Sequence, residues 1–166
     1  MNNHFLRKKK ILLVSHDLTF TGSPLVLVEC GVLLKSSGAD VSFCSLDGQR
    51  DRDHPACRAG FGWVTPRKAR TNVLDFDLLV ANTLAGGTKS WVADVLLEYP
   101  KVASKIIWWV HEIDCELYGS QMKNFSKVAA AIFDSHASLR AWKKWGVTLP
   151  SLSSVVHLGV AQEFLE

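Results

Sequence analysis

One stretch near the start of the chain, residues 10–38, restricts the possible folds more than any other part of the sequence. Residues 11–14 are Ile-Leu-Leu-Val, an uninterrupted apolar run with a polar residue on each side. Such a run is typical of a strand that is buried on both faces, as in the middle of a parallel sheet. We therefore expect the core of the protein to form around a central parallel strand.

A helix is predicted shortly after this strand. Ser23 suits the helix cap, and Pro24 suits the first turn, where its missing N–H costs nothing. Gly38 suits the end of the helix. Apolar residues at helical spacing predict the buried face, namely Leu25, Val28 and Val32, with Leu33 and Leu34 nearby.

The order of strand, glycine turn and helix start has a chemical consequence. It directs free backbone N–H groups and the positive end of a helix at one spot, which favours an anion such as a phosphate. Neither GxGxxG nor GxxxxGK[ST] is present, so the dinucleotide and P-loop fingerprints are absent. A simple tight turn therefore stays open as the alternative interpretation.

The rest of the chain alternates predicted strands with predicted helices. This pattern favours one α/β domain, a Rossmann-like open parallel sheet with helices on both faces. Adjacent Trp108 and Trp109 are expected to point to opposite faces of their strand and to pack against the two helix layers. The further strands are expected at residues 41–46, 61–64, 76–80, 105–110, 129–133 and 153–158.

Composition excludes several classes of protein. The chain has 166 residues, 48% of them hydrophobic, and a net charge of +3, which is too mild to indicate nucleic-acid binding. Its four cysteines show no CxxC spacing, and no apolar run is long enough for a signal segment or a membrane span. We therefore expect a cytoplasmic protein. Contact with an anionic membrane stays a minor alternative, because of the basic run at residues 7–10 and the segment Trp142–Trp145.

Polar residues follow several of the predicted strands. The carboxyl ends of parallel strands meet at one edge of a sheet, and ligands bind there. His111 either belongs to such a site or is a structural histidine bonded to a loop carbonyl. The string HEIDC lacks the second histidine of HExxH, so no metal site is expected. The candidates are His16, Asp17, Asn82, Thr83, His111, Glu112, Asp134 and Ser135.

Five motifs occur along the chain in an order that resembles a known family. They are VSH…GSP, ANT, WWVHE, IFDSHASLRAWKKWG and VVHLGV. Together they resemble the N-terminal domain of retaining glycosyltransferases with the GT-B fold, glycosyltransferase family four, and we consider a plant-type member. The resemblance covers residues 10–160.

The resemblance implies roles for individual residues. Enzymes of this family have two Rossmann-like domains, an N-terminal one for the acceptor and a C-terminal one for the nucleotide sugar. By resemblance, His111 is the catalytic residue beside the transferred sugar. Gly22, Ser23 and Glu112 would lie near the donor diphosphate, although Pro24 removes one backbone donor there. The acceptor side would include His16, Asn82, Thr83 and Ser135.

The resemblance also predicts the domain organisation. Residues 1–9 would form a basic arm, residues 10–160 the acceptor-side domain, and residues 161–166 the start of an interdomain linker. The C-terminal donor domain is absent from this chain, so we expect it to be inactive alone and to need that domain as a partner in cis or in trans. The substrates would be a nucleotide sugar and an unknown acceptor, with no separate cofactor and no metal. The alternative is a non-catalytic Rossmann-like binding or scaffold module.

Overall fold

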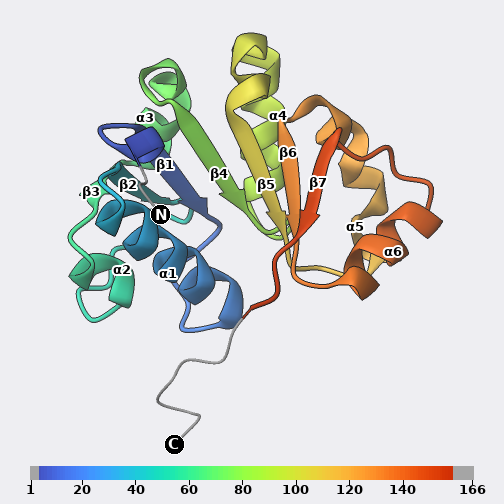
Figure 1. Ribbon diagram of the computed structural model, residues 1–166, viewed down its shortest axis with the longest axis horizontal. Coiled ribbons are helices and arrows are strands. Elements are labelled where there is room, and N and C mark those ends of the chain that lie inside the picture. Colours follow the sequence, from blue (N-terminus) through green and yellow to red (C-terminus); the bar gives the residue numbers. More distant parts are fainter. Residues whose placement is uncertain (1–3, 159–166) are drawn as a thin grey trace, which may run out of the picture.

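A seven-stranded parallel sheet forms the centre of the molecule (Figure 1). The computed structural model describes residues 4–158. The strand order is β3-β2-β1-β4-β5-β6-β7, and every neighbouring pair is parallel. The strands are β1 (Lys10–Ser15), β2 (Asp40–Ser45), β3 (Gly62–Trp63), β4 (Leu78–Asn82), β5 (Ile106–Val110), β6 (Ala130–Phe133) and β7 (Leu152–Val155).

The order of the strands reverses direction once. The chain runs outward from β1 through β2 to β3, then returns to place β4 on the other side of β1 and continues outward to β7. Strands β1 and β4 therefore flank the point at which the loops of an open α/β sheet separate and ligands bind. The predicted open parallel sheet is confirmed.

Helices cover both faces of this sheet, as predicted (Figure 1). Helices α1 (Gly22–Ser36) and α2 (Pro55–Arg58) pack on one face, and α3 (Pro66–Thr71), α4 (Thr88–Glu98) and α6 (His136–Lys144) pack on the other. None of the helices among residues 4–158 combines the length and the apolar character needed to cross a membrane. The remaining helical segments are η1 (His4–Leu6), η2 (Val73–Asp75), η3 (Pro100–Lys105), α5 (Cys115–Tyr118) and η4 (Gly119–Lys127).

Strand β5 shows how the sheet separates two apolar cores. Trp108 is buried in the core on the α4 side, and Trp109 is buried in the core on the α1 side. The expectation that these two rings pack against opposite helix layers is confirmed. Neither ring is exposed enough to stack on a sugar, since both are at least 95% buried.

Helix α1 corrects two expectations. Its cap is Thr21 rather than Ser23, because the helix already begins at Gly22 and Ser23 lies in the first turn. The predicted buried face is wrong in part, since Val28 is buried as predicted but Leu33 is 68% exposed and Val32 is exposed as well. The residues that face the sheet are Pro24, Leu27, Val28 and Gly31.

Gly31 explains the rotation of this helix. A Cβ atom added there would lie 2.6 Å from Leu13 Cδ1 and 2.7 Å from Phe61 Cζ. Only glycine lets the helix approach these two buried side chains so closely, and this contact turns Val32 and Leu33 toward solvent.

Two further parts of the chain differ from the predicted elements. Residues 47–70, where only the strand at 61–64 is predicted from the sequence, also contain α2 and α3. These helices are too short for a visible period, but His54 and Thr65 cap them with side-chain hydrogen bonds. The last strand ends at Val155 rather than at residue 158, and the predicted closing residues Gly159 and Val160 lie outside the described part.

The packing of α1 predicts that Gly31→Ala destabilises the protein. Overpacking costs about 1–3 kcal/mol, which exceeds the roughly 1 kcal/mol that alanine gains in helix propensity. Gly22→Ala is a matched control, because nothing lies within 4 Å of an added Cβ atom at that end of the same helix. Urea unfolding should show a lower free energy of unfolding for Gly31→Ala only. Equal stability of the two variants would contradict this packing.

Candidate functional site

A chain of hydrogen bonds connects the carboxyl ends of three neighbouring strands with the start of α1. Trp109 Nε1 donates to Asp134 Oδ1 at 2.8 Å, and Asp134 Oδ2 lies 2.6 Å from His111 Nδ1. His111 Nε2 lies 2.7 Å from Asn82 Oδ1, and Asn82 Nδ2 donates to the Ser23 carbonyl at 2.9 Å. The structure therefore brings His111, Asn82 and the Gly22–Ser23 turn to one edge of the sheet.

The partners of His111 define how its ring is bonded. Asn82 uses its Nδ2 group for the Ser23 carbonyl, so it presents its oxygen to the histidine. Asp134 presents a carboxylate oxygen to the other ring nitrogen. The two partners therefore hold the ring from both nitrogens and fix its orientation. The side chain of His111 is 13% exposed, so only a small part of it is accessible to a ligand.

Glu112, the next residue, holds the loop between β4 and α4. Its Oε1 atom accepts hydrogen bonds from Thr83 Oγ1, from the Leu84 N–H at 2.8 Å and from the Ala85 N–H at 3.2 Å. Its Oε2 atom accepts from the His111 N–H at 3.2 Å. This carboxylate therefore fixes the loop that follows Asn82.

Thr83 is part of the same arrangement. Its φ of 71° lies in the left-handed region, which a β-branched residue rarely adopts. The buried side chain bonds to Glu112, and the Thr83 carbonyl accepts from Trp108 Nε1 at 2.9 Å. Such a conformation persists only where the surroundings hold it, and it clusters at functional sites.

Ser135 lies at the same edge but has a local bond. Its Oγ atom accepts from the Ser138 N–H at 3.1 Å and caps α6. Ser138 Oγ and Trp142 Nε1 in turn donate to the Glu112 carbonyl at 3.1 and 2.9 Å. Helix α6 is therefore fixed to the end of β5.

His16 lies at the end of β1, and its ring packs against Gly86. Its Nε2 atom pairs with Asp17 Oδ2 at 3.1 Å, while Nδ1 is buried without a hydrogen-bond partner. The structure thus places His16 at the predicted edge, between the loops after β1 and β4. No hydrogen bond described for this part of the chain joins it to His111.

The starts of the six α-helices differ in a way that points to this edge. Side chains of His54, Thr65, Asp114 and Ser135 cap α2, α3, α5 and α6. Helices α1 and α4, which follow the two strands at the reversal point, have no side-chain cap and no acidic residue in the first turn. The N–H groups of Gly22 and Ser23 find no acceptor within the described residues, so the positive end of α1 is free to receive an anion.

Three of the four cysteines are poorly suited to act as nucleophiles. Burial raises the pKa of the Cys44 thiol to about 12, and the charge of Asp47 adds to the shift. Burial also raises the pKa of Cys30 and of Cys115. Raised pKa values keep these three thiols protonated, whereas the reactive form is the thiolate. Among the described residues, no group of three or more His, Cys, Asp or Glu side chains could hold a metal ion.

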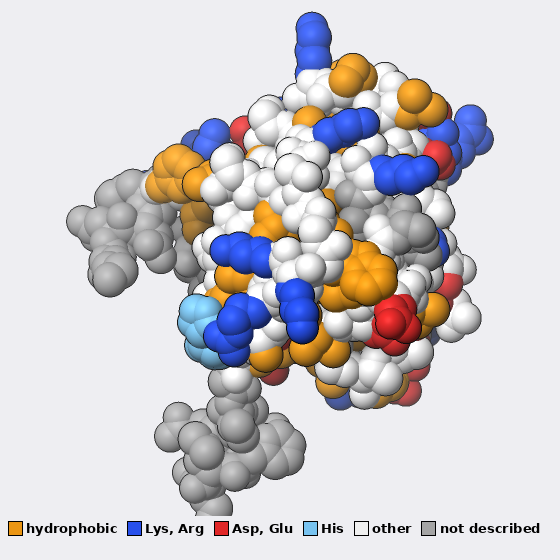
Figure 2. Space-filling model, turned by 90° about the vertical axis from the view of Figure 1, so that its right-hand side faces the viewer, with side chains coloured by type: hydrophobic (Ala, Val, Ile, Leu, Met, Phe, Trp, Pro, Cys, Tyr) orange, Lys and Arg blue, Asp and Glu red, His pale blue; other side chains and the backbone are white. Residues whose placement is uncertain are grey.

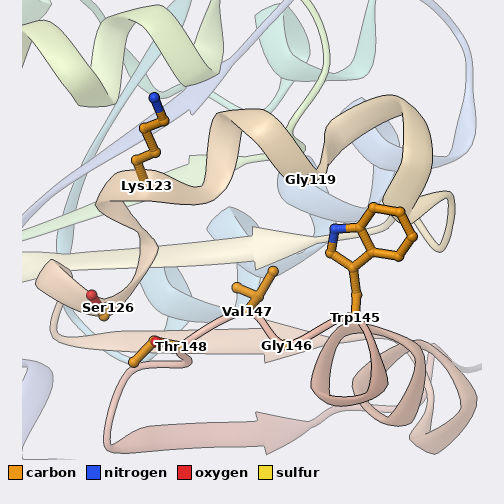
Figure 3. Close-up of a pocket in the computed structure, with 7 residues that line it drawn as sticks. All are labelled: Gly119, Lys123, Ser126, Trp145, Gly146, Val147 and Thr148. Carbon is orange, nitrogen blue, oxygen red and sulfur yellow. The ribbon is translucent and has the colours of Figure 1, made fainter.

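A hollow of about 310 Å³ lies away from these residues, between η4 and the loop after α6 (Figure 3). Trp145 forms one side of it and Ser126 and Thr148 lie on the other, but none of the predicted site residues line it. Trp142 is buried and packs in the core, whereas Trp145 is 50% exposed. Figure 2 shows this side of the molecule, where Lys and Arg side chains lie among hydrophobic and uncharged ones.

Sequence reasoning named Asp134 as a candidate at a strand end but gave it no role in the site. The residue directly follows β6, which was the signal, but an Asp-Ser pair before a helix is equally typical of a cap. The carboxylate instead holds two rings of β5, those of Trp109 and His111.

Comparisons with known proteins identify the family. Residues 7–166 match the family described as Glycosyl-transferase family 4. The chain therefore belongs to this family of glycosyltransferases, which confirms the resemblance inferred from the five motifs; the plant-type assignment stays a prediction. No curated protein matches the chain. Among solved structures, it is similar to BdcA (YjgI) from E. coli, with a TM-score of 0.48 and 13% identity, over 91% of this chain and 98% of that chain.

The bonds of Glu112 predict that Glu112→Gln destabilises the protein. The amide replaces one accepting oxygen by an NH₂ group that faces other donors, and leaving a buried donor unpaired costs about 1–3 kcal/mol. Glu116→Gln on the exposed side of α5 is the matched control. Urea unfolding should show the loss for Glu112→Gln alone. Unchanged stability would mean that the carboxylate does not hold the loop.

Proposed function

We propose that this chain is the acceptor-side half of a retaining GT-B glycosyltransferase that uses a nucleotide sugar. One observation carries the proposal: the hydrogen-bonded chain from the uncapped start of α1 through Asn82 to His111. Within a glycosyltransferase family, an anion site and a hydrogen-bonding histidine on one edge match the two ends of an activated sugar. The diphosphate needs the anion site, and the sugar hydroxyls need the histidine.

The proposed reaction exchanges one bond at the anomeric carbon for another. The bond from that carbon to the diphosphate oxygen breaks, a bond to an acceptor oxygen forms, and the acceptor hydroxyl gives its proton to the leaving diphosphate. Positive charge develops on the sugar ring and negative charge on the leaving diphosphate. The N–H groups of Gly22 and Ser23 would stabilise the leaving group, because the positive helix end is already oriented before reaction.

His111 would bind a hydroxyl of the transferred sugar. The hydroxyl would take the place of Asn82 Oδ1 at Nε2, while Asp134 keeps the ring oriented through Nδ1. Glu112 would act through the backbone that it holds, because its own charge repels a diphosphate. The acceptor would approach from the side of His16, Asn82, Thr83 and Ser135.

The proposal includes a partner. Sugar transfer needs a cleft that excludes water and fixes both reactants, and one domain provides one wall of it. We therefore propose that transfer requires a donor-binding domain, supplied in cis or in trans, and that the chain alone is inactive. The test is to assay sugar transfer from nucleotide sugars by this chain alone and together with a family-four donor domain. Transfer only in the combination supports the proposal; donor binding without transfer in any combination supports a scaffold module instead.

In that combination, His111→Ala should lower kcat/KM for transfer by about a hundredfold, as expected for a lost donor to the transition state. His136→Ala is the control, because this exposed histidine begins α6 and lies outside the hydrogen-bonded chain. Circular dichroism checks that both variants stay folded. Unchanged turnover of His111→Ala would remove His111 from the site.

A further inference from the structure

The loop between β1 and α1 holds the capping residue of α1 away from the helix. Thr21 precedes α1, and a threonine at this position ordinarily accepts a hydrogen bond from an N–H group of the first turn. In this structure the Thr21 side chain makes no such bond. Its Oγ1 atom lies 2.8 Å from Thr19 Oγ1 instead. The start of α1 is therefore open although a suitable capping residue precedes it.

The direction of the contact between the two threonines follows from a second bond of Thr19. Thr19 Oγ1 donates its only hydrogen to Asp17 Oδ1 at 3.0 Å, so toward Thr21 it can only accept. The Thr21 hydroxyl is therefore the donor. Asp17 Oδ1 also accepts from the Thr19 N–H at 3.1 Å, so one carboxylate oxygen fixes both the backbone and the side chain of Thr19.

The other oxygen of Asp17 connects this loop to the end of β1. Asp17 Oδ2 lies 3.1 Å from His16 Nε2. His16 is one of the residues expected on the acceptor side, and Thr21 lies directly before the expected diphosphate site. Both ends of the loop thus belong to one hydrogen-bonded chain, from His16 through Asp17 and Thr19 to Thr21.

A buried histidine holds the same loop from the segment before α2. His54 is fully buried, and its Nε2 atom lies 3.3 Å from the Thr19 carbonyl oxygen. Its Nδ1 atom accepts from the Ala56 N–H at 3.2 Å, so the tautomer with hydrogen on Nε2 satisfies both contacts. The ring of Phe20 packs edge-on against the ring of His54, with 5.0 Å between the centroids. His54 therefore anchors the loop at two successive residues.

We propose that Thr19 and His54 are positioning residues that keep the start of α1 open for the donor diphosphate. His54 holds the Thr19 backbone, and Thr19 in turn holds the Thr21 hydroxyl away from the helix. This assignment rests on the proposed function, in which the first N–H groups of α1 bind the diphosphate. It adds that the site is kept free of its own cap by residues that do not touch the ligand.

Releasing Thr19 would let Thr21 compete with the ligand. A capping side chain bonds to the N–H of the second or third helical residue. In α1 these are Ser23 and Pro24, and proline has no N–H. A cap formed by Thr21 would therefore use the Ser23 N–H, which is one of the two groups proposed to bind the diphosphate.

The test titrates inorganic pyrophosphate into this chain and follows the amide signals at the start of α1 by NMR. Thr19→Val keeps the β-branched shape but lacks the hydroxyl, so Thr21 can turn to the helix and the affinity should fall about fivefold, the size of one helix cap. Adding Thr21→Val removes the competing hydroxyl and should restore the affinity to within about twofold. Thr21→Val alone is the control and should bind like the unsubstituted chain. Both threonines are exposed, so these substitutions leave the core intact.

His54 is tested with two amides that each keep one half of its bonding. Glutamine reaches farther and can donate its NH₂ group to the Thr19 carbonyl, whereas asparagine is shorter and can accept from the Ala56 N–H. His54→Asn should therefore weaken pyrophosphate binding about fivefold, as Thr19→Val does. His54→Gln should bind more tightly than His54→Asn, although it loses the cap of α2.

Three results would overturn the assignment. They are unchanged affinity of Thr19→Val, a double variant that binds as weakly as Thr19→Val, and equal weakening by His54→Asn and His54→Gln. Removal of a second side chain would not restore binding if Thr19 only stabilised the fold.

The three-bond couplings of the Thr21 side chain separate this assignment from the proposed function. They report the χ1 rotamer of Thr21, which should change in Thr19→Val whether or not pyrophosphate binds. If the rotamer changes but pyrophosphate shifts no signal in any variant, the hold of Thr19 on Thr21 stands and the diphosphate site at α1 is wrong. An unchanged rotamer would contradict the role of Thr19 itself.

Discussion

The carboxamide of Asn82 is the interaction on which the functional edge of this protein depends. It ends β4, its side chain is in the interior, and it bonds on one side to the first turn of α1 and on the other to His111. Because β1 and β4 are neighbours, this amide spans the point where the strand order reverses. It joins the loops after β1 and β4 into one surface. Glu112 accepts a hydrogen bond from the Leu84 N–H in the loop after β4, and Asp134 bonds to the ring of His111.

The helix starts that no side chain caps indicate which ligands this edge of the sheet can bind. In four α-helices a side chain accepts from one N–H of the first turn, whereas α1 and α4, on opposite faces of the sheet, have no such cap. Two positive helix ends thus border the same edge, with the histidine beyond β4. An activated sugar carries a diphosphate and hydroxyls. The uncapped start of α1, which follows a parallel strand, accounts for the proposed contact with the diphosphate.

The sequence predicted the sheet well, because a strand buried on both faces consists of consecutive apolar residues, as Ile11–Val14 does. The sequence did not predict the rotation of α1 correctly. That rotation depends on the close contact of Gly31 with Leu13 and Phe61, which lie in other segments of the chain. The rule that polar residues gather where parallel strands end was enough to single out His111 and Asn82. It did not reveal that these two bond to each other, or that Asp134 orients the ring, because side-chain partners depend on the register of β4, β5 and β6.

A double-mutant cycle between Asn82 and His111 tests the central claim most directly. The free energies of unfolding of Asn82→Ala, His111→Ala and the double variant are measured in urea and compared with the unsubstituted chain. If the amide and the ring hold each other, the two losses are not additive, and the coupling energy is about 1 kcal/mol or more. Additive losses, within about 0.5 kcal/mol, would show that the two side chains act independently and that the edge is not one site.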